Sequence, residues 1–121
     1  FHQAGWSRGE YLEIAPALNA LGYNCLALDQ RSGGAVNGVE NASHRAAKAQ
    51  GKRTEYVDAL PDMIAALEWA RREHAKGPLI AWGSSYSSAL VLKIAPVFVN
   101  GIVLPSLFGA VDRGPKPPKQ Q

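Results

Sequence analysis

Short apolar runs alternate with stretches of helical periodicity along this chain of 121 residues. Three of the runs, at residues 23–28, 78–82 and 97–104, have the length and composition of buried strands. Strands separated by helices favour a parallel sheet, because each crossover must return to the same end of the sheet. The pattern therefore predicts an α/β fold, a mostly parallel sheet with flanking helices, whose ligands bind at the carboxyl ends of the strands.

The helical stretches carry apolar residues at spacings of three and four. Residues 10–21 have such a stripe, in which Pro16 either kinks the helix or marks the first turn of a shorter one. Gly22 is placed to cap its C-terminal end. A second stripe covers residues 57–67, and Pro61 is expected to bend or restart that helix.

Composition excludes several classes of protein. Hydrophobic residues make up 46% of the chain, enough for a packed core, which excludes wholesale disorder. A net charge of +3 is well below that of a dedicated nucleic-acid binder, so no such partner is expected. The single cysteine, Cys25, excludes an internal disulfide framework and a multi-cysteine metal site. No apolar run approaches the roughly 18 residues that a membrane span needs.

The character of the chain changes towards its C-terminal end. Residues 1–108 carry the alternating pattern and are expected to form the core, whereas residues 109–121 are rich in proline and lysine and are expected to be disordered. Within the core, residues 29–53 form a long polar stretch in which residues 46–49 can supply a helical turn. A polar stretch of that length is typical of a functional loop.

The segment G-S-S-Y-S, residues 83–87, lies between a predicted strand and a helical stretch at residues 89–95. A nucleophile held on a sharp strand-to-helix turn has a strained backbone, and the residues two positions to either side of it crowd each other. Small residues are therefore needed at both flanks. The turn exposes the hydroxyl and places the next backbone N–H at a helix N-terminus, where it can stabilise an oxyanion.

The flanks also select the register of the turn. A nucleophile at Ser84 would have Trp82 and Tyr86 at its flanks, and both are too large. Ser87 is sterically possible, but it would require the strand to continue through two further serines. Ser85, flanked by small residues on both sides, is the predicted nucleophile.

Three stretches carry a family resemblance in consistent order. F-H-Q-A-G-W-S-R-G-E-Y resembles a loop that follows a third strand, L-G-Y-N-C-L-A-L-D-Q-R-S-G-G a fourth strand with its exit loop, and G-P-L-I-A-W-G-S-S-Y-S-S-A-L a fifth strand with its nucleophile elbow. The sequence resembles the α/β-hydrolase superfamily, nearest to its dienelactone-hydrolase-like and peptidase-like esterase branches. V-N-G-I-V-L-P-S looks like the sixth strand. The resemblance implies a partial α/β-hydrolase fold covering the third to sixth strands and incomplete at both ends.

The resemblance also implies an activity. Ser85 would attack ester or related acyl bonds of a small-molecule substrate and form an acyl-serine intermediate, without a cofactor or a metal. The backbone N–H of Tyr86 would be one oxyanion donor. The second donor would come from Gln3 or Ala4, because the chain has His2-Gln3 where the family usually has His-Gly.

The rest of the catalytic triad departs from the family pattern, in which an acid and then a histidine follow the serine. The three histidines, His2, His44 and His74, all precede Ser85. Asp112 is the sole acid after Ser85, and its setting in the tail argues against a catalytic role. Without a base a serine hydroxyl is a poor nucleophile, so a truncated fragment with weak or no activity is expected.

Two other functions remain open from the residues. The chain is alternatively a catalytically dead remnant that acts as an interaction or anion-binding module, since residues 44–53 carry four Lys and Arg residues and no acid. A nucleotide-binding protein has less support, because the chain lacks a P-loop and a G-x-G-x-x-G spacing. With its third strand nearly absent, the predicted sheet would have open edges, and self-association through them is expected.

Overall fold

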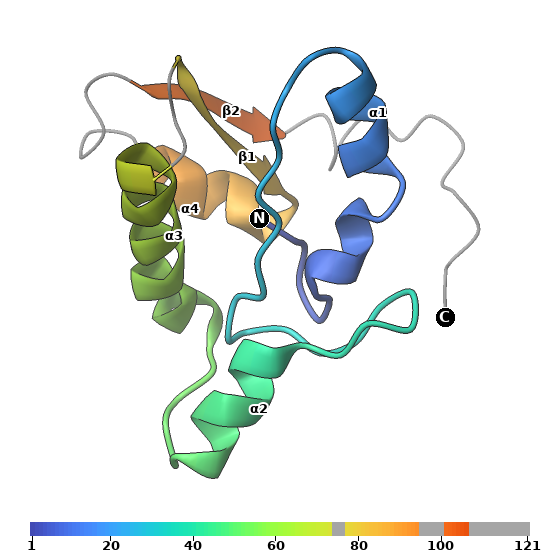
Figure 1. Ribbon diagram of the computed structural model, residues 1–121. Coiled ribbons are helices and arrows are strands. Elements are labelled where there is room, and N and C mark those ends of the chain that lie inside the picture. The colour runs from blue at the N-terminus through green and yellow to red at the C-terminus, as the bar shows by residue number, and fades with distance from the viewer. Residues whose placement is uncertain (74–76, 95–100, 107–121) are drawn as a thin grey trace.

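The computed structural model describes residues 1–73, 77–94 and 101–106 (Figure 1). Within these residues, four α-helices and two short strands are joined by loops and 3₁₀ turns. In chain order the elements are η1 (Arg8–Tyr11), α1 (Ile14–Ala20), α2 (Ala42–Ala49), η2 (Tyr56–Ala59), α3 (Leu60–Glu73), β1 (Leu79–Ser84), α4 (Tyr86–Ile94) and β2 (Gly101–Ser106). No helix of this described part is long and apolar enough to cross a membrane.

The expectation of a mostly parallel sheet is wrong, and with it the expected partial α/β-hydrolase fold. In the described residues only β1 and β2 pair, in parallel, with Leu79 opposite Gly101. Residues 23–28, expected to be a strand, have no strand structure and are largely exposed. An apolar run becomes a strand only when a neighbouring strand satisfies its backbone groups, and this run has no such neighbour among the residues that the structure describes.

Several local expectations are confirmed. Pro16 lies in the first turn of α1, so the expected long helix is a shorter one that starts at Ile14. Gly22, with φ +93°, follows the end of α1 in the left-handed conformation typical of a capping glycine. Pro61 is the second residue of α3, which restarts as an α-helix directly after η2. The predicted turn at 46–49 is the second half of α2.

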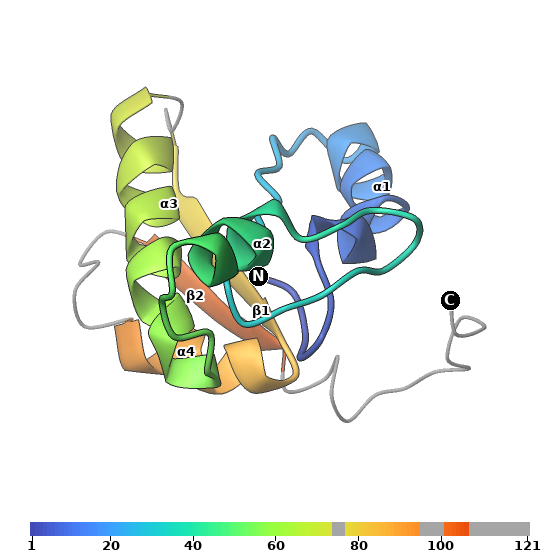
Figure 2. The ribbon, with the colours of Figure 1, turned by 90° about the horizontal axis from the view of Figure 1, so that it is seen from below.

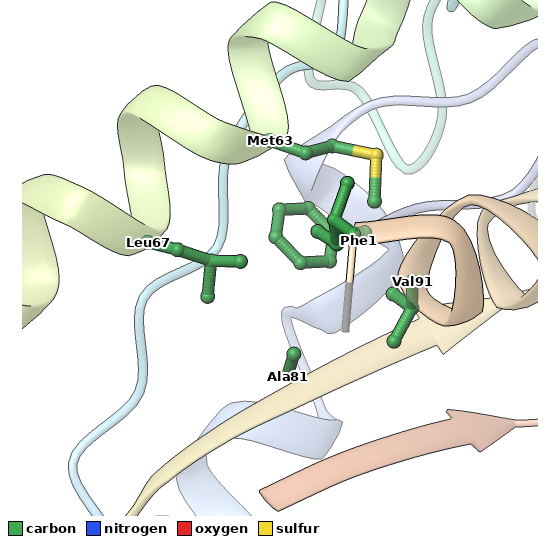
Figure 3. Packing of buried hydrophobic residues seen from close by; sticks show 6 residues of the cluster. Phe1, Met63, Leu67, Ala81 and Val91 are labelled. Carbon is green, nitrogen blue, oxygen red and sulfur yellow. The ribbon is translucent and has the colours of Figure 1, made fainter. Parts of the chain in front are cut away.

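The core lies between α3, β1 and α4. Met63 and Leu67 from α3 face the ring of Phe1, with Ala81 of β1 and Val91 of α4 beside it (Figure 3). Both Met63 and Val91 have no solvent exposure. In both ribbon views α1 lies on the opposite side of the molecule from α3, away from this core (Figure 2). No residue of α1 is buried.

The backbone of Phe1 extends the hydrogen-bonding ladder of β1. Its N atom donates to the carbonyl of Trp82 at 2.7 Å, and its carbonyl accepts from the N–H of Ser84 at 3.1 Å. These two bonds follow the parallel pattern and occupy the edge of β1 that β2 leaves open. The segment after Phe1 is therefore held beside the carboxyl end of β1. The expected tail at residues 109–121 lies outside the described residues.

Candidate active site

Ser85 forms the sharp turn between β1 and α4. The strand ends at Ser84 and the helix begins at Tyr86, so a single residue reverses the chain. Ser85 has φ +56°, and Asn37 is the other non-glycine residue of the described chain with a positive φ. Asparagine tolerates this conformation, whereas for serine it stores backbone strain that the surrounding structure must hold. The strain lies at the residue that the flank argument selects.

The two flanks of Ser85 approach each other closely. A Cβ atom added at Gly83 would lie 2.5 Å from the carbonyl oxygen of Ser87 and 2.8 Å from Cγ2 of Val91. Ser88 further ties the turn together, because its hydroxyl donates to the carbonyl of Gly83 at 2.9 Å. A larger residue at position 83 would therefore push α4 away from β1. The small flanks are a steric requirement of this turn.

The three serines of the segment differ in what their hydroxyls can reach. Ser87 is fully buried, and its hydroxyl donates to the carbonyl of His2 at 2.5 Å. Ser84 is buried at the end of β1. Ser85 is half-buried, and its hydroxyl makes no hydrogen bond with the described residues. Ser85 is thus the serine whose hydroxyl is available to a substrate.

The expected oxyanion donors lie at the start of α4 and in the segment after Phe1. Tyr86 is the first residue of α4, where backbone N–H groups have no helical partner. The N–H of Gln3, however, donates to Oε1 of Glu10 at 2.8 Å and is therefore occupied. The N–H of Ala4 makes no hydrogen bond with the described part of the chain. Of the two alternatives for the second donor, the geometry favours Ala4.

Neither described histidine is hydrogen-bonded to the hydroxyl of Ser85. Nε2 of His2 accepts from the N–H of Gln30 at 2.8 Å, so Nδ1 carries the proton and donates to the carbonyl of Gln3 at 2.9 Å. Burial lowers the pKa of His2 and keeps the ring neutral.

The other candidates for the triad show no bond to Ser85 in the described residues. Nδ1 of His44, on α2, donates to the carbonyl of Arg31 at 2.8 Å. His74 and Asp112, also considered from the sequence, lie outside the described residues.

Sequence reasoning missed the contribution of Gln30 and Ser32 to this site. Gln30 is fully buried, and its Nε2 donates to the hydroxyl of Tyr86 at 2.7 Å and to that of Ser87 at 2.8 Å. The hydroxyl of Ser32 also bonds to that of Tyr86. Burial raises the pKa of Tyr86, which therefore stays a neutral hydrogen-bonding group. The loop after residue 28 thus holds the first turn of α4, and its position after an apolar run was the available signal.

The same loop is anchored from two further sides. Asp29 is buried, and its carboxylate accepts from the N–H groups of Arg8 at 2.8 Å and Ala42 at 2.9 Å. Asn41 caps α2 by accepting from the N–H of His44 at 2.8 Å, while its amide donates to the carbonyl of Gln30 at 2.7 Å. These contacts fix the loop before any ligand arrives. They use up the polar groups of Asp29 and Asn41, so both are structural.

No group of three or more His, Cys, Asp or Glu side chains in the described ranges is arranged to hold a metal ion. Comparison with known proteins adds no family: no protein-family model matches the chain, and neither curated proteins nor solved structures show a significant similarity to it. The geometry around Ser85 is therefore the main indication of function in the described residues.

Proposed function

We propose that this protein is a serine hydrolase that cleaves ester or related acyl bonds through an acyl-serine intermediate. The observation that carries the proposal is the left-handed backbone of Ser85 between β1 and α4, enclosed by flanks that allow no added Cβ at Gly83. Strain at a serine on a strand-to-helix turn is costly and persists only where the surrounding structure holds it, which favours a catalytic role. The resemblance to α/β-hydrolase esterases supports the proposal through the sequence around Ser85, whereas the fold of the described residues gives it no support.

The proposed reaction has two steps. The Oγ atom of Ser85 adds to the carbonyl carbon of the substrate, and its proton passes to a general base. The resulting oxyanion accepts hydrogen bonds from the N–H groups of Tyr86 and Ala4, and its collapse expels the alcohol, which takes up the proton. Water then cleaves the acyl-serine ester, releases the carboxylic acid and restores the hydroxyl. His2 has both ring nitrogens hydrogen-bonded, and His44 has its Nδ1 bonded to the carbonyl of Arg31, so neither described histidine is bonded to the hydroxyl of Ser85.

Labelling by a fluorophosphonate tests the proposal, because it reacts with activated serines and leaves inert ones unmodified. We expect a slow label, because no described histidine is bonded to the hydroxyl, located at Ser85 by peptide mass spectrometry and abolished by Ser85→Ala. Ser84→Ala is the matched control, since it removes the neighbouring hydroxyl and should leave labelling intact. Absence of the label from the full chain, or its persistence in Ser85→Ala, would contradict the proposed function.

A second candidate function, self-association, is favoured by the exposed segment that follows α1. Leu21, Tyr23 and Leu26 are 74%, 51% and 47% exposed. The backbone groups of residues 24–28 make no hydrogen bonds with the described chain. An exposed apolar segment with unpaired backbone groups is a template for pairing with another strand. We propose that two copies of the chain pair through this segment.

Sedimentation velocity over a range of concentrations tests this pairing. We expect a dimer whose fraction rises with concentration and is lost in Leu26→Lys. Leu12→Lys is the control, because Leu12 is 54% exposed but lies before α1 and outside the segment. A monomer at all concentrations would exclude the pairing.

The anion-binding alternative has less support. Arg45 pairs with Glu40 at 2.7 Å, and Arg53 lies 3.6 Å from a carboxylate oxygen of Asp58. Two of the four cations in residues 44–53 are thus partly neutralised by Glu40 and Asp58, which lie outside that stretch of the sequence. The stretch is an exposed, mixed-charge surface in the folded chain.

A further inference from the structure

An aromatic pair begins at the residue next to Ser85. Tyr86 follows the nucleophile in sequence, and the ring of Tyr56 from η2 packs against its ring in a tilted arrangement, with centroids 4.6 Å apart and planes inclined by 32°. Tyr56 is 56% exposed, so much of the pair faces solvent. We call Tyr56 and Tyr86 the aromatic shelf. An exposed aromatic surface next to a reactive residue is typical of a place where ligand binds.

The shelf is held rigidly from both sides. The hydroxyl of Tyr86 is bonded to Gln30 and Ser32, which fixes the direction of its ring. On the other side, η2 is closed by a capping box between Glu55 and Asp58, each side chain accepting from the backbone of the other. A preformed surface loses little conformational freedom when a ligand covers it, so contact with it contributes fully to binding.

We infer that the acyl group of the substrate is apolar and longer than acetyl, and that it lies on the aromatic shelf. The inference rests on the proposed function, because it names the substrate class of the Ser85 site. The leaving group must face the general base that protonates it, and no described histidine is hydrogen-bonded to the hydroxyl of Ser85. The shelf, which the described residues do supply, is therefore assigned to the acyl side of the scissile carbonyl.

The charges beside the shelf support an uncharged acyl group. Glu55 and Asp58 lie in and next to η2, and Arg53 is already paired with Asp58. A carboxylate on the acyl chain would be repelled by Glu55 and Asp58. Arg53 would not offset this repulsion, because it is already paired with Asp58. An alkyl or aryl chain would instead cover the exposed ring of Tyr56.

Acylation by p-nitrophenyl acetate and p-nitrophenyl hexanoate tests the inference on the full chain. The ratio of their second-order acylation rate constants is measured from release of p-nitrophenolate, with the acyl-enzyme identified by mass. Hexanoate has four more methylenes than acetate, and each raises the acylation rate constant by up to about fourfold when fully buried. A shelf covers the chain on one side only, so we expect the rate constant for hexanoate to be about tenfold higher in total. Tyr56→Ala should remove most of this preference, and Tyr56→Phe, which keeps the ring, should retain it.

Leu12→Ala is the matched control, because it removes an apolar side chain of similar exposure that lies between η1 and α1, outside the shelf, and should leave the ratio unchanged. A wild-type ratio near one, or a preference that survives Tyr56→Ala, would overturn the inference while leaving the proposed function intact. Failure of the fluorophosphonate to label Ser85 would overturn the proposed function, and the inference with it.

Discussion

Replacing Ser85 by glycine is expected to leave the protein more stable than replacing it by alanine. Both variants remove the hydroxyl, so they differ in the backbone alone. At most positions alanine is the more stabilising of the two, because glycine loses more conformational entropy on folding. The positive φ of Ser85 should reverse this order, since alanine must hold a left-handed conformation that glycine adopts readily.

The size of the effect follows from two opposing terms. An L-residue pays about 1–2 kcal/mol in the left-handed region, and the entropy of glycine offsets about 0.5–1 kcal/mol of the relief. We therefore expect Ser85→Gly to unfold with a free energy about 0.5–1 kcal/mol higher than that of Ser85→Ala. Ala46→Gly, at an exposed interior position of α2, should instead lose about 1 kcal/mol relative to the wild type.

Urea unfolding followed by circular dichroism measures both differences, provided that the slopes of the transitions agree. If Ser85→Ala proves the more stable variant by 0.5 kcal/mol or more (roughly the usual order of the two residues), the backbone of Ser85 is unstrained. The steric basis for choosing Ser85 over its neighbours would then be lost. The result does not depend on activity, so it tests the turn separately from the chemistry.

Three further predictions concern the surroundings of the turn. Gly83→Ala should lower the free energy of unfolding by about 3 kcal/mol, because its Cβ meets backbone atoms. Gly77→Ala, where an added Cβ meets open space, should change this free energy by less than about 0.5 kcal/mol. Equal effects of the two substitutions would refute the crowding at Gly83. Burial lowers the pKa of His2 below its ordinary value of 6.5, so the unfolded chain binds more protons and stability should fall as the pH drops below about 6.5, by up to about 1.4 kcal/mol per pH unit. His2→Gln should flatten that slope in urea titrations at several pH values, and an unchanged slope would assign it to other groups. Asn41→Ala should lower the free energy of unfolding by about 2–3 kcal/mol in the same assay, because it removes the cap of α2 and the buried donor to the carbonyl of Gln30. Asn24→Ala, at an exposed position, should leave stability unchanged. Similar losses in both variants would argue against a structural role for Asn41.

Features governed by near neighbours in the chain could be predicted from the sequence. The shortened α1, the restart of α3 at Pro61 and the turn at Ser85 each depend on sterics within a few residues. Proline restricts its own φ and removes a donor, and bulky flanks exclude a register of the turn, whatever the rest of the fold does. These predictions therefore needed no knowledge of the tertiary structure.

The sheet could not be predicted in this way. Residues 23–28 and 79–84 are both apolar runs of strand length, yet only the second is a strand. Strand propensity describes how well a run fits a paired, half-buried surface, and it does not supply the partner. In the described residues the run at 23–28 has no neighbouring strand and stays largely exposed, whereas β1 is bounded by β2 and Phe1.

The candidate site divides along the same line. The sequence by itself determined which serine stands on the strand-to-helix turn, because the small flanks of Ser85 are local requirements. Only the tertiary structure decided which groups surround it: Gln30 and Ser32 on Tyr86, Glu10 on the N–H of Gln3, and the ring of Tyr56 beside the site. Hydrogen bonds and ring contacts between residues far apart in the chain depend on how the elements pack. Periodicity and flank size carry no information about that packing.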